Sequence, residues 1–278
     1  MINRFFLCVL MAIPSWVSGQ QFFLGAKGGV EAFTSRYQNP EIRYNIKNGI
    51  RGGMKGGGIL IFPLPDEVSF VVELEYSIMG RRTKYFDCSL INKSTYNFIE
   101  FPLLLRKTFN LNINNFASGV YVNIGPNIKY WMGGTSKIME ISAFGGDSKY
   151  SIQFSDTLAG NNLADIDPKT KDPIFYMTMV NPNRFIYGLD FGIGYVAHVL
   201  GNQRFYAEAR FTYVHTYLGK HNSEIQMQSQ VFTNYILQND LRSAFRVVNL
   251  SFGWARHFDF RKLKKGQSTI DRKKRIRK

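Results

Sequence analysis

The sequence predicts an all-β protein: a closed, antiparallel, up-and-down transmembrane β-barrel of eight strands, with ten strands as the alternative. Three observations support this fold class. The 278 residues are rich in aromatic side chains (15 %) and in glycine (25) but poor in proline (9), a composition that suits pleated, bending strands. Apolar and polar residues alternate with period two in eight segments. The connections between these segments alternate between short and long, as they do in outer-membrane barrels.

The alternation is clearest in the last segment. Its even positions carry the large apolar residues Val248, Leu250, Phe252 and Trp254, and its odd positions carry small or polar residues. The same rule assigns seven further strands to residues 22–34, 49–62, 68–80, 95–109, 119–132, 185–199 and 204–218. Each segment therefore has one face suited to hydrocarbon and one suited to a polar or small-residue interior.

The connections predict which end of the barrel faces which compartment. Short links are expected at 63–67, 110–118 and 200–203, and long ones at 35–48, 81–94, 133–184 and 219–243. Transmembrane barrels have short periplasmic turns and long extracellular loops, so an even strand count places both termini in the periplasm. In the longest loop, Ile138–Ala143 and Tyr150–Phe154 form either a hairpin above the membrane or a ninth and tenth strand.

Charged residues lie on the polar face of these strands, and they predict a closed lumen. An Arg or Lys on the lipid face costs about 2–4 kcal/mol at the bilayer midplane, so the charges should point inward. An eight-stranded barrel is just wide enough for side chains to fill, and six acids with six bases can pair there. We expect the following twelve residues to hold the barrel together rather than to catalyse a reaction: Lys27, Glu31, Arg51, Lys55, Glu73, Glu75, Glu100, Arg106, Lys129, Asp190, Glu208 and Arg210.

The two ends of the chain differ from the barrel, which we assign to residues 20–260. Residues 1–19 read as a secretory signal peptide, with Arg4, a short apolar run and a small-residue cleavage site at Val17–Gly19. Residues 261–278 form a basic tail. It holds one acid and ten of the bases behind the net charge of +15: Arg261, Lys262, Lys264, Lys265, Arg272, Lys273, Lys274, Arg275, Arg277 and Lys278. Because the excess charge is concentrated there, it does not indicate nucleic-acid binding.

The tail has two interpretations. In the periplasm it would meet anionic lipid headgroups, peptidoglycan carboxylates or an acidic protein partner, at roughly 1 kcal/mol per base near an anionic surface. Alternatively it is a solvated, disordered extension.

Four segments make the chain resemble the PorT-like outer-membrane β-barrel family of Bacteroidota. They are residues 22–29 (FFLGAKGG), 98–106 (FIEFPLLLR), 121–126 (YVNIGP) and 188–195 (GLDFGIGY). The family pattern also accounts for Pro102 inside a predicted strand. The resemblance implies an outer-membrane barrel of eight to ten strands in a Gram-negative bacterium. Some relatives serve the type IX secretion and gliding apparatus.

The expected function is therefore non-enzymatic: a structural or accessory barrel of an envelope complex, surrounded by outer-membrane lipid. The alternative is a small passive pore or a small-solute-binding barrel. An enzyme would need a cluster such as His215 and His221 with Ser223 or Asp240, whose spacing fits no nucleophile or zinc motif. No cofactor is expected, because Asp165–Asp172 lacks the central Gly and final Glu of a calcium loop.

Overall fold

The computed structural model describes residues 21–38, 46–85, 90–113, 116–140, 147–155, 165–166, 173–199, 202–227 and 241–259. The predicted signal peptide (1–19) and basic tail (261–278) lie outside these residues.

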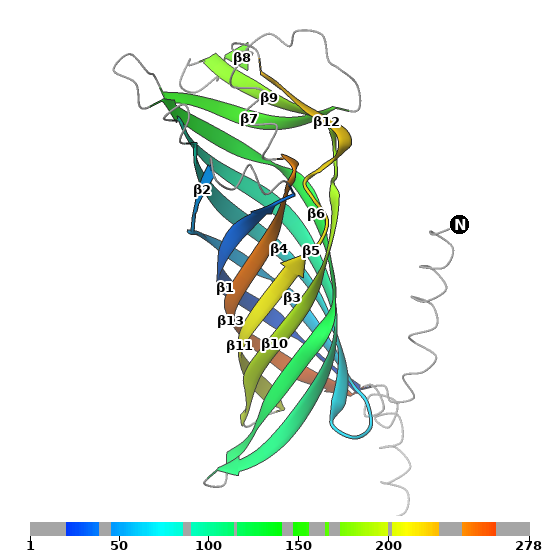
Figure 1. The fold of residues 1–278 in the computed structure, drawn as a ribbon. Helices are drawn as coiled ribbons and strands as arrows, with labels where there is room; N and C mark the ends of the chain where they lie inside the picture. The colour runs from blue at the N-terminus through cyan, green and yellow to red at the C-terminus, as the bar shows by residue number, and fades with distance from the viewer. Residues whose placement is uncertain are drawn as a thin grey trace, which may run out of the picture.

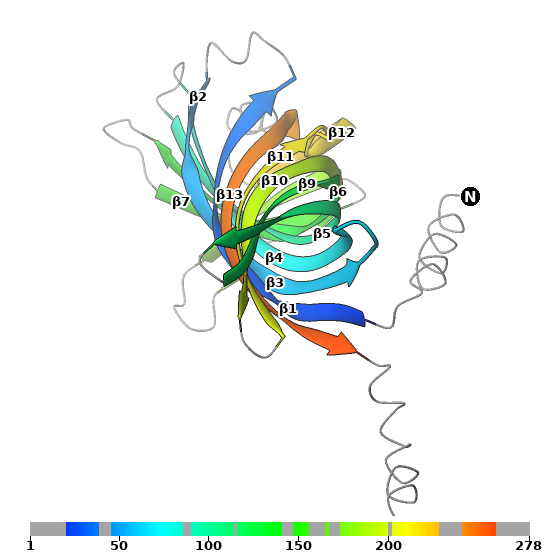
Figure 2. The same cartoon turned by 90° about the horizontal axis from the view of Figure 1, so that it is seen from below.

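Eight strands pair side by side in a closed ring (Figures 1 and 2). They are β1 (Gln21–Tyr37), β3 (Arg51–Pro63), β4 (Val68–Tyr85), β5 (Leu90–Ile113), β6 (Phe116–Glu140), β10 (Phe185–Val199), β11 (Gln203–Val214) and β13 (Ser243–Asp259). Each pairs antiparallel with the next in this order, and β13 pairs with β1 to complete the ring. The prediction of an all-β, antiparallel, eight-stranded arrangement is confirmed, and the ten-stranded alternative is wrong.

The first and last strands of the ring fix its orientation. β1 and β13 pair along their whole length, from Gln21 opposite Asp259 to Tyr37 opposite Ser243. Gln21 and Asp259 therefore lie at one end of the barrel, and the connections β3–β4, β5–β6 and β10–β11 lie at this same end. We call it the short-turn end, and the opposite end the long-loop end.

Close approach of the strands requires glycine at particular inward positions. Gly57 on β3 lies opposite Lys27 of β1. A Cβ atom added to Gly57 would lie 1.9 Å from the carbonyl oxygen of Leu74 on β4. The strongly curved sheet therefore has no room for a side chain at this position.

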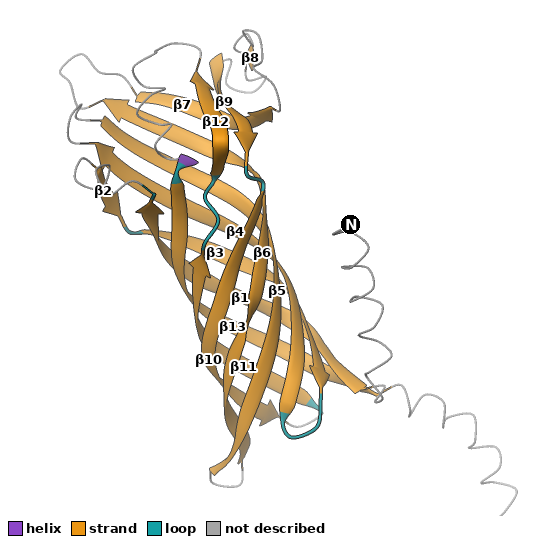
Figure 3. Cartoon of the chain, turned by 45° about the vertical axis from the view of Figure 1, so that its right-hand side comes forward, coloured by secondary structure: helices purple, strands orange, loops and turns teal. Residues whose placement is uncertain are grey.

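The sheet continues beyond the ring at the long-loop end (Figure 3). β6 pairs antiparallel with β7 (Asp147–Ser155), β7 runs parallel to β9 (Pro173–Pro182), and β9 pairs with β12 (Gly219–Met227). Two short strands, β2 (Ile46–Gly49) and β8 (Asp165–Ile166), pair with β4 and β9. Among the residues that the model describes, no helix has the length and apolar character to cross a membrane.

This extension corrects the predicted loops. Residues expected in the connection 81–94 belong largely to β4, which ends at Tyr85, and to β5, which begins at Leu90. The strands continue because inward and outward positions still alternate, but the buried side chains there include polar residues such as Thr83, Asn92 and Ser94. Of the two alternatives for the longest loop, the pairing of β6 with β7 corresponds to a hairpin above the ring.

Candidate functional site

The outer face of the ring is apolar. Leu250 on β13 is 54 % exposed, whereas its neighbours Asn249 and Ser251 are buried. The same alternation on the other strands exposes Leu24, Val30, Met54, Leu74, Ile99, Leu105, Val122, Ile124, Leu189, Phe191, Ile193, Phe205, Phe211 and Phe252. A continuous apolar surface around a barrel is the surface that hydrocarbon solvates.

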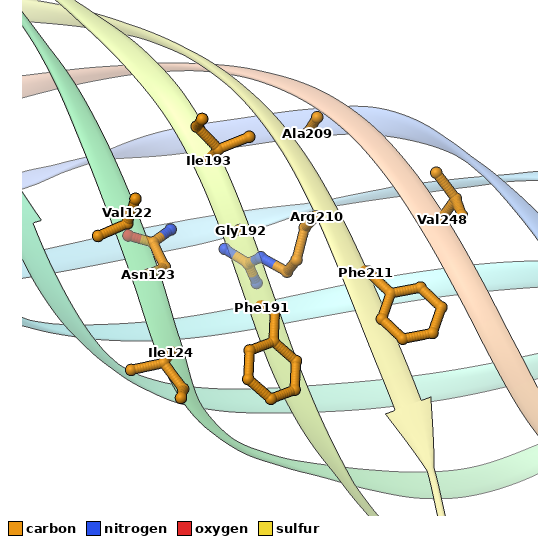
Figure 4. A pocket seen from close by; sticks show the side chains of 10 residues that line it. All are labelled: Val122, Asn123, Ile124, Phe191, Gly192, Ile193, Ala209, Arg210, Phe211 and Val248. Carbon is orange, nitrogen blue, oxygen red and sulfur yellow. The ribbon is translucent and has the colours of Figure 1, made fainter.

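A shallow groove of about 660 Å³ marks this outer face where β6, β10, β11 and β13 run side by side (Figure 4). The small residue Ala209 lies among larger apolar side chains, including Phe191, Phe211 and Val248. Gly192 forms part of the wall, with the inward-pointing Asn123 and Arg210 close behind it. At this groove, therefore, little more than strand backbone separates the lipid-facing surface from the charged interior.

In the middle of the lumen, an ion pair spans the ring. Arg210 comes from β11 and Glu73 from β4, and these two strands are four places apart in either direction around eight. The guanidinium approaches both carboxylate oxygens of Glu73, at 2.7 and 2.9 Å. Both side chains are fully buried. A bidentate pair of this kind fixes the geometry of both partners.

Glu208 connects this pair to the rest of the interior. Its carboxylate accepts hydrogen bonds from Lys27 (2.8 Å), Asn123 (2.7 Å) and Tyr121 (3.1 Å), and it also pairs with Arg210 at 2.6 Å. Lys27 contacts Glu73 as well, at 3.0 Å. These four charges therefore form a connected cluster, in which each ion has an opposite charge beside it.

A second set of charges lies next to this cluster. Lys129 on β6 and Glu100 on β5 are direct cross-strand partners, with their charged atoms 2.7 Å apart. Lys55 pairs with Glu75 at 2.7 Å. The amide of Asn127 donates to Glu100 and, at 3.1 Å, to Asp190. Because Asp190 also pairs with Arg210 at 3.3 Å, Asn127 links the two sets.

The structure buries eleven of the twelve residues that the sequence assigned to the lumen, and Arg51 is the exception. The register of the chain against β4 changes by one residue between Gly49 opposite Arg82 and Gly53 opposite Met79. The inward parity therefore differs before and after this shift, and Arg51, which lies within it, is exposed. A single period-two pattern drawn through residues 49–62 could not detect such an irregularity.

Sequence reasoning also missed an inward-facing base, Arg81, which is buried and donates to the hydroxyl of Tyr37 at 2.6 Å. Like Glu73 and Glu75, Arg81 has an odd number and therefore faces inward, but it lies one residue beyond the predicted strand end at residue 80. A longer strand assignment would have included it.

Apolar and aromatic side chains form buried clusters toward both ends of the lumen, which the sequence did not predict. Toward the long-loop end, a large cluster includes Phe33, Tyr96, Phe98, Trp131 and Phe245. Their rings contact one another edge to face or at tilted angles, and the ring centres of Tyr96 and Trp131 lie 5.3 Å apart. Toward the short-turn end, a smaller cluster consists of Phe23, Ile59, Ile61, Val71, Leu104, Tyr121, Val196, Tyr206 and Ala255. The central ion pairs thus lie between two largely apolar clusters, which we call the apolar caps. Two bases lie at the caps themselves, Arg81 beside Tyr37 and Arg106 over the rings of Tyr121 and Tyr206.

Of the residues considered for catalysis, the structure describes the side chains of His215 and Ser223. His215 is exposed, and the hydroxyl of Ser223 bonds to the backbone of Lys220 and Asn181. Asp240 and the side chain of His221 lie outside the described residues. Within those residues, no group of three or more His, Cys, Asp or Glu side chains is placed to hold a metal ion.

A closed antiparallel ring with an apolar outside and paired charges inside defines a membrane-spanning β-barrel protein. The chain belongs to the outer membrane protein beta-barrel domain family, whose model matches residues 18–214. It is thus an outer-membrane β-barrel of a Gram-negative bacterium, in contact with membrane lipid.

Solved structures similar to this chain are also outer-membrane proteins. OprG of Pseudomonas aeruginosa is 12 % identical with a TM-score of 0.46, and the match covers 87 % of this chain and 96 % of OprG. Neisserial surface protein A is 15 % identical with a TM-score of 0.37, covering 85 % and 97 %. A major outer membrane protein of Thermus thermophilus is 9 % identical with a TM-score of 0.37, covering 86 % and 99 %. A search of curated proteins found no match.

Proposed function

We propose that the protein is a closed, non-enzymatic outer-membrane barrel that acts as a structural or accessory component of an envelope complex. The observation that carries this proposal is the Arg210–Glu73 pair, which joins opposite walls of the ring. A solute passing through the lumen would have to break this pair and then pass two apolar caps. Breaking a buried pair leaves an uncompensated charge, at about 3–5 kcal/mol. This barrier favours a closed barrel over the passive pore.

Uptake into protein-loaded vesicles tests the closed lumen. The full chain is reconstituted into liposomes, and swelling is followed in isotonic solutions of small sugars. We expect swelling no faster than in protein-free vesicles. A rate that rises with protein content and falls with sugar size would support the passive pore instead.

We further propose that the partner is a periplasmic one, reached through the basic tail at residues 261–278. The termini of the described barrel lie together at the short-turn end, which we assign to the periplasm. Ten bases in eighteen residues suit peptidoglycan carboxylates or an acidic protein of a secretion complex. The resemblance to PorT-like proteins of Bacteroidota supports the type IX secretion and gliding apparatus as that complex.

Crosslinking in intact cells tests this assignment. A photo-crosslinking residue is placed in the tail, and the products are identified by mass spectrometry. We expect a defined envelope partner that is lost when residues 261–278 are deleted, while the barrel still reaches the outer membrane. If the deletion leaves the crosslinked partners and the cellular phenotype unchanged, the tail has no such role.

A further inference from the structure

Three basic or potentially basic side chains face inward at the short-turn mouth of the barrel. Arg204 is the second residue of β11, and His198 on β10 is its direct cross-strand partner. On the other side of β11, His257 lies two residues beyond the cross-strand partner of Arg204 on β13. Each of the three is half-buried and follows or precedes, by two residues, a buried residue of its own strand: Tyr206, Val196 and Ala255. We call Arg204, His198 and His257 the basic mouth.

Arg204 is held at the mouth by an aromatic ring rather than by an acid. Its guanidinium carbon lies 3.9 Å from the ring centre of Phe23, and the ring of His257 lies against the same Phe23 at 4.8 Å. Within the described part of the chain, no carboxylate forms an ion pair with Arg204. A guanidinium over an aromatic face keeps its N–H edge free, and this planar edge matches the two oxygens of a carboxylate.

A second donor without a partner lies two residues further along β11. The hydroxyl of Tyr206 is buried and has no hydrogen-bond partner among the residues that the model describes. Arg204 and Arg106 both lie close enough to interact with this hydroxyl electrostatically. Because buried polar groups normally have a partner, an unmet hydroxyl beside an arginine without an acid points to an anionic acceptor from outside the chain.

The nearby acids have other contacts. The carboxylate of Asp259 accepts a hydrogen bond from Gln21 at 3.2 Å, and that of Glu67 accepts one from Asn110. The donors at the mouth are therefore in excess over the acceptors, and the site suits an anion that enters from the compartment at this end.

The shape of the barrel restricts which anion can enter. An eight-stranded ring is just wide enough for side chains to fill, so the end of a chain fits the mouth, whereas a folded protein surface does not. Lipid headgroups would lie on the other side of the wall, where Phe205 is exposed. The tail at residues 261–278 carries ten bases, so its own charge opposes binding to Arg204.

We propose that the basic mouth binds the terminal carboxylate of a peptidoglycan stem peptide, with the guanidinium of Arg204 as its main contact. Stem peptides are short chains that end in carboxylates, and they occupy the periplasm. The proposal rests on the assignment of the short-turn end to the periplasm, which belongs to the proposed function. It depends neither on binding through the tail nor on whether the lumen conducts.

Titration calorimetry on the full chain in a neutral detergent tests the proposal. The ligands are a soluble disaccharide-tetrapeptide released from peptidoglycan and the same fragment with its carboxylates amidated. We expect the wild type to bind the first fragment and not the second. Arg204→Met should weaken binding about 10-fold or more, because a charged hydrogen bond is lost. Arg204→Lys should weaken it less, since the ammonium keeps the charge but lacks the planar fork.

The matched control is Arg256→Met, which removes an exposed arginine at the same end but on the outer face. It should leave the affinity unchanged. Four outcomes would overturn the proposal: no binding by the wild type, equal binding of the amidated fragment, wild-type affinity in both Arg204 variants, or an equal loss in the control. Full competition by inorganic phosphate at millimolar concentration would overturn the choice of a carboxylate. Heat-dependent mobility on gels checks that each variant is folded.

Deletion of residues 261–278 separates this site from the proposed interaction of the tail. The deletion variant should keep binding that depends on Arg204, even if the crosslinked partners of the tail are lost in cells. Binding that disappears with the tail but persists in Arg204→Met would contradict the mouth site and leave the tail interaction standing.

Discussion

Arg210 of β11 and Glu73 of β4 form a bidentate ion pair across the full width of the barrel. Both side chains are fully buried, and Glu208 and Lys27 pair with them in turn. The two strands lie on opposite sides of the ring, so the pair connects elements that share no backbone hydrogen bond. This contact therefore connects opposite walls of the barrel through side chains alone.

Removing one member of this pair should destabilise the barrel strongly. Arg210→Met leaves the carboxylates of Glu73, Glu208 and Asp190 short of one positive charge, and we expect a loss of about 3–5 kcal/mol in the free energy of unfolding. Equilibrium unfolding by urea in lipid vesicles, followed by tryptophan fluorescence, measures it.

A double-mutant cycle separates the pair from general loss of packing. The double variant Glu73→Leu/Arg210→Met should lose less stability than the sum of the two single variants, because neither charge is then left alone. Arg256→Met, on the exposed outer face, serves as the control and should change stability by less than about 0.5 kcal/mol. Additive effects of the two single substitutions would show that the pair is not energetically coupled.

The apolar outer face should respond to charge according to depth. Leu250 lies in the middle of β13, whereas Leu111 lies near the short-turn end of β5, and both are exposed on the outside. We expect Leu250→Arg to destabilise the folded barrel by about 2–4 kcal/mol and Leu111→Arg by about 0–1 kcal/mol. The measurement is unfolding in vesicles, and equal effects at the two depths would contradict a membrane-spanning position.

Two neighbouring glycines of the ring should tolerate alanine very differently. At Gly57 the new methyl group would meet the backbone of Leu74 and Glu75, whereas at Gly28 the nearest atom is 3.7 Å away. We expect Gly57→Ala to lower the stability of the barrel by about 1–3 kcal/mol, through overpacking. Gly28→Ala should be neutral or slightly stabilising. Heat-dependent mobility on gels compares the folded fractions, and equal behaviour of the two variants would mean that the sheet can relax at Gly57.

Period-two alternation was sufficient to predict the eight strands of the ring and their lipid-facing side. It works there because hydrocarbon on one side and a narrow interior on the other impose opposite requirements on alternate residues. The same reasoning placed Glu73, Glu208 and Arg210 inside, but no periodic pattern says which strands face each other across a ring. The Arg210–Glu73 pair depends on strand number and closure, and these appear only in three dimensions.

Other features escaped prediction for local reasons. Arg51 lies at a one-residue register change and is exposed, and periodicity cannot locate such a change. Beyond the apolar band the outward residues are polar, as at Arg82 and Lys93, so the contrast between faces that marks a strand disappears. The aromatic caps were missed because Phe98 and Trp131 face inward, where the alternation was interpreted as small or polar.

The most direct test of the closed barrel is an ion-current recording across a planar bilayer containing the purified full chain. With the Arg210–Glu73 pair and both apolar caps in place, we predict that the current stays at the baseline of the protein-free membrane, with no steady open level. A reproducible, voltage-independent open level that scales with the amount of inserted protein would contradict the account.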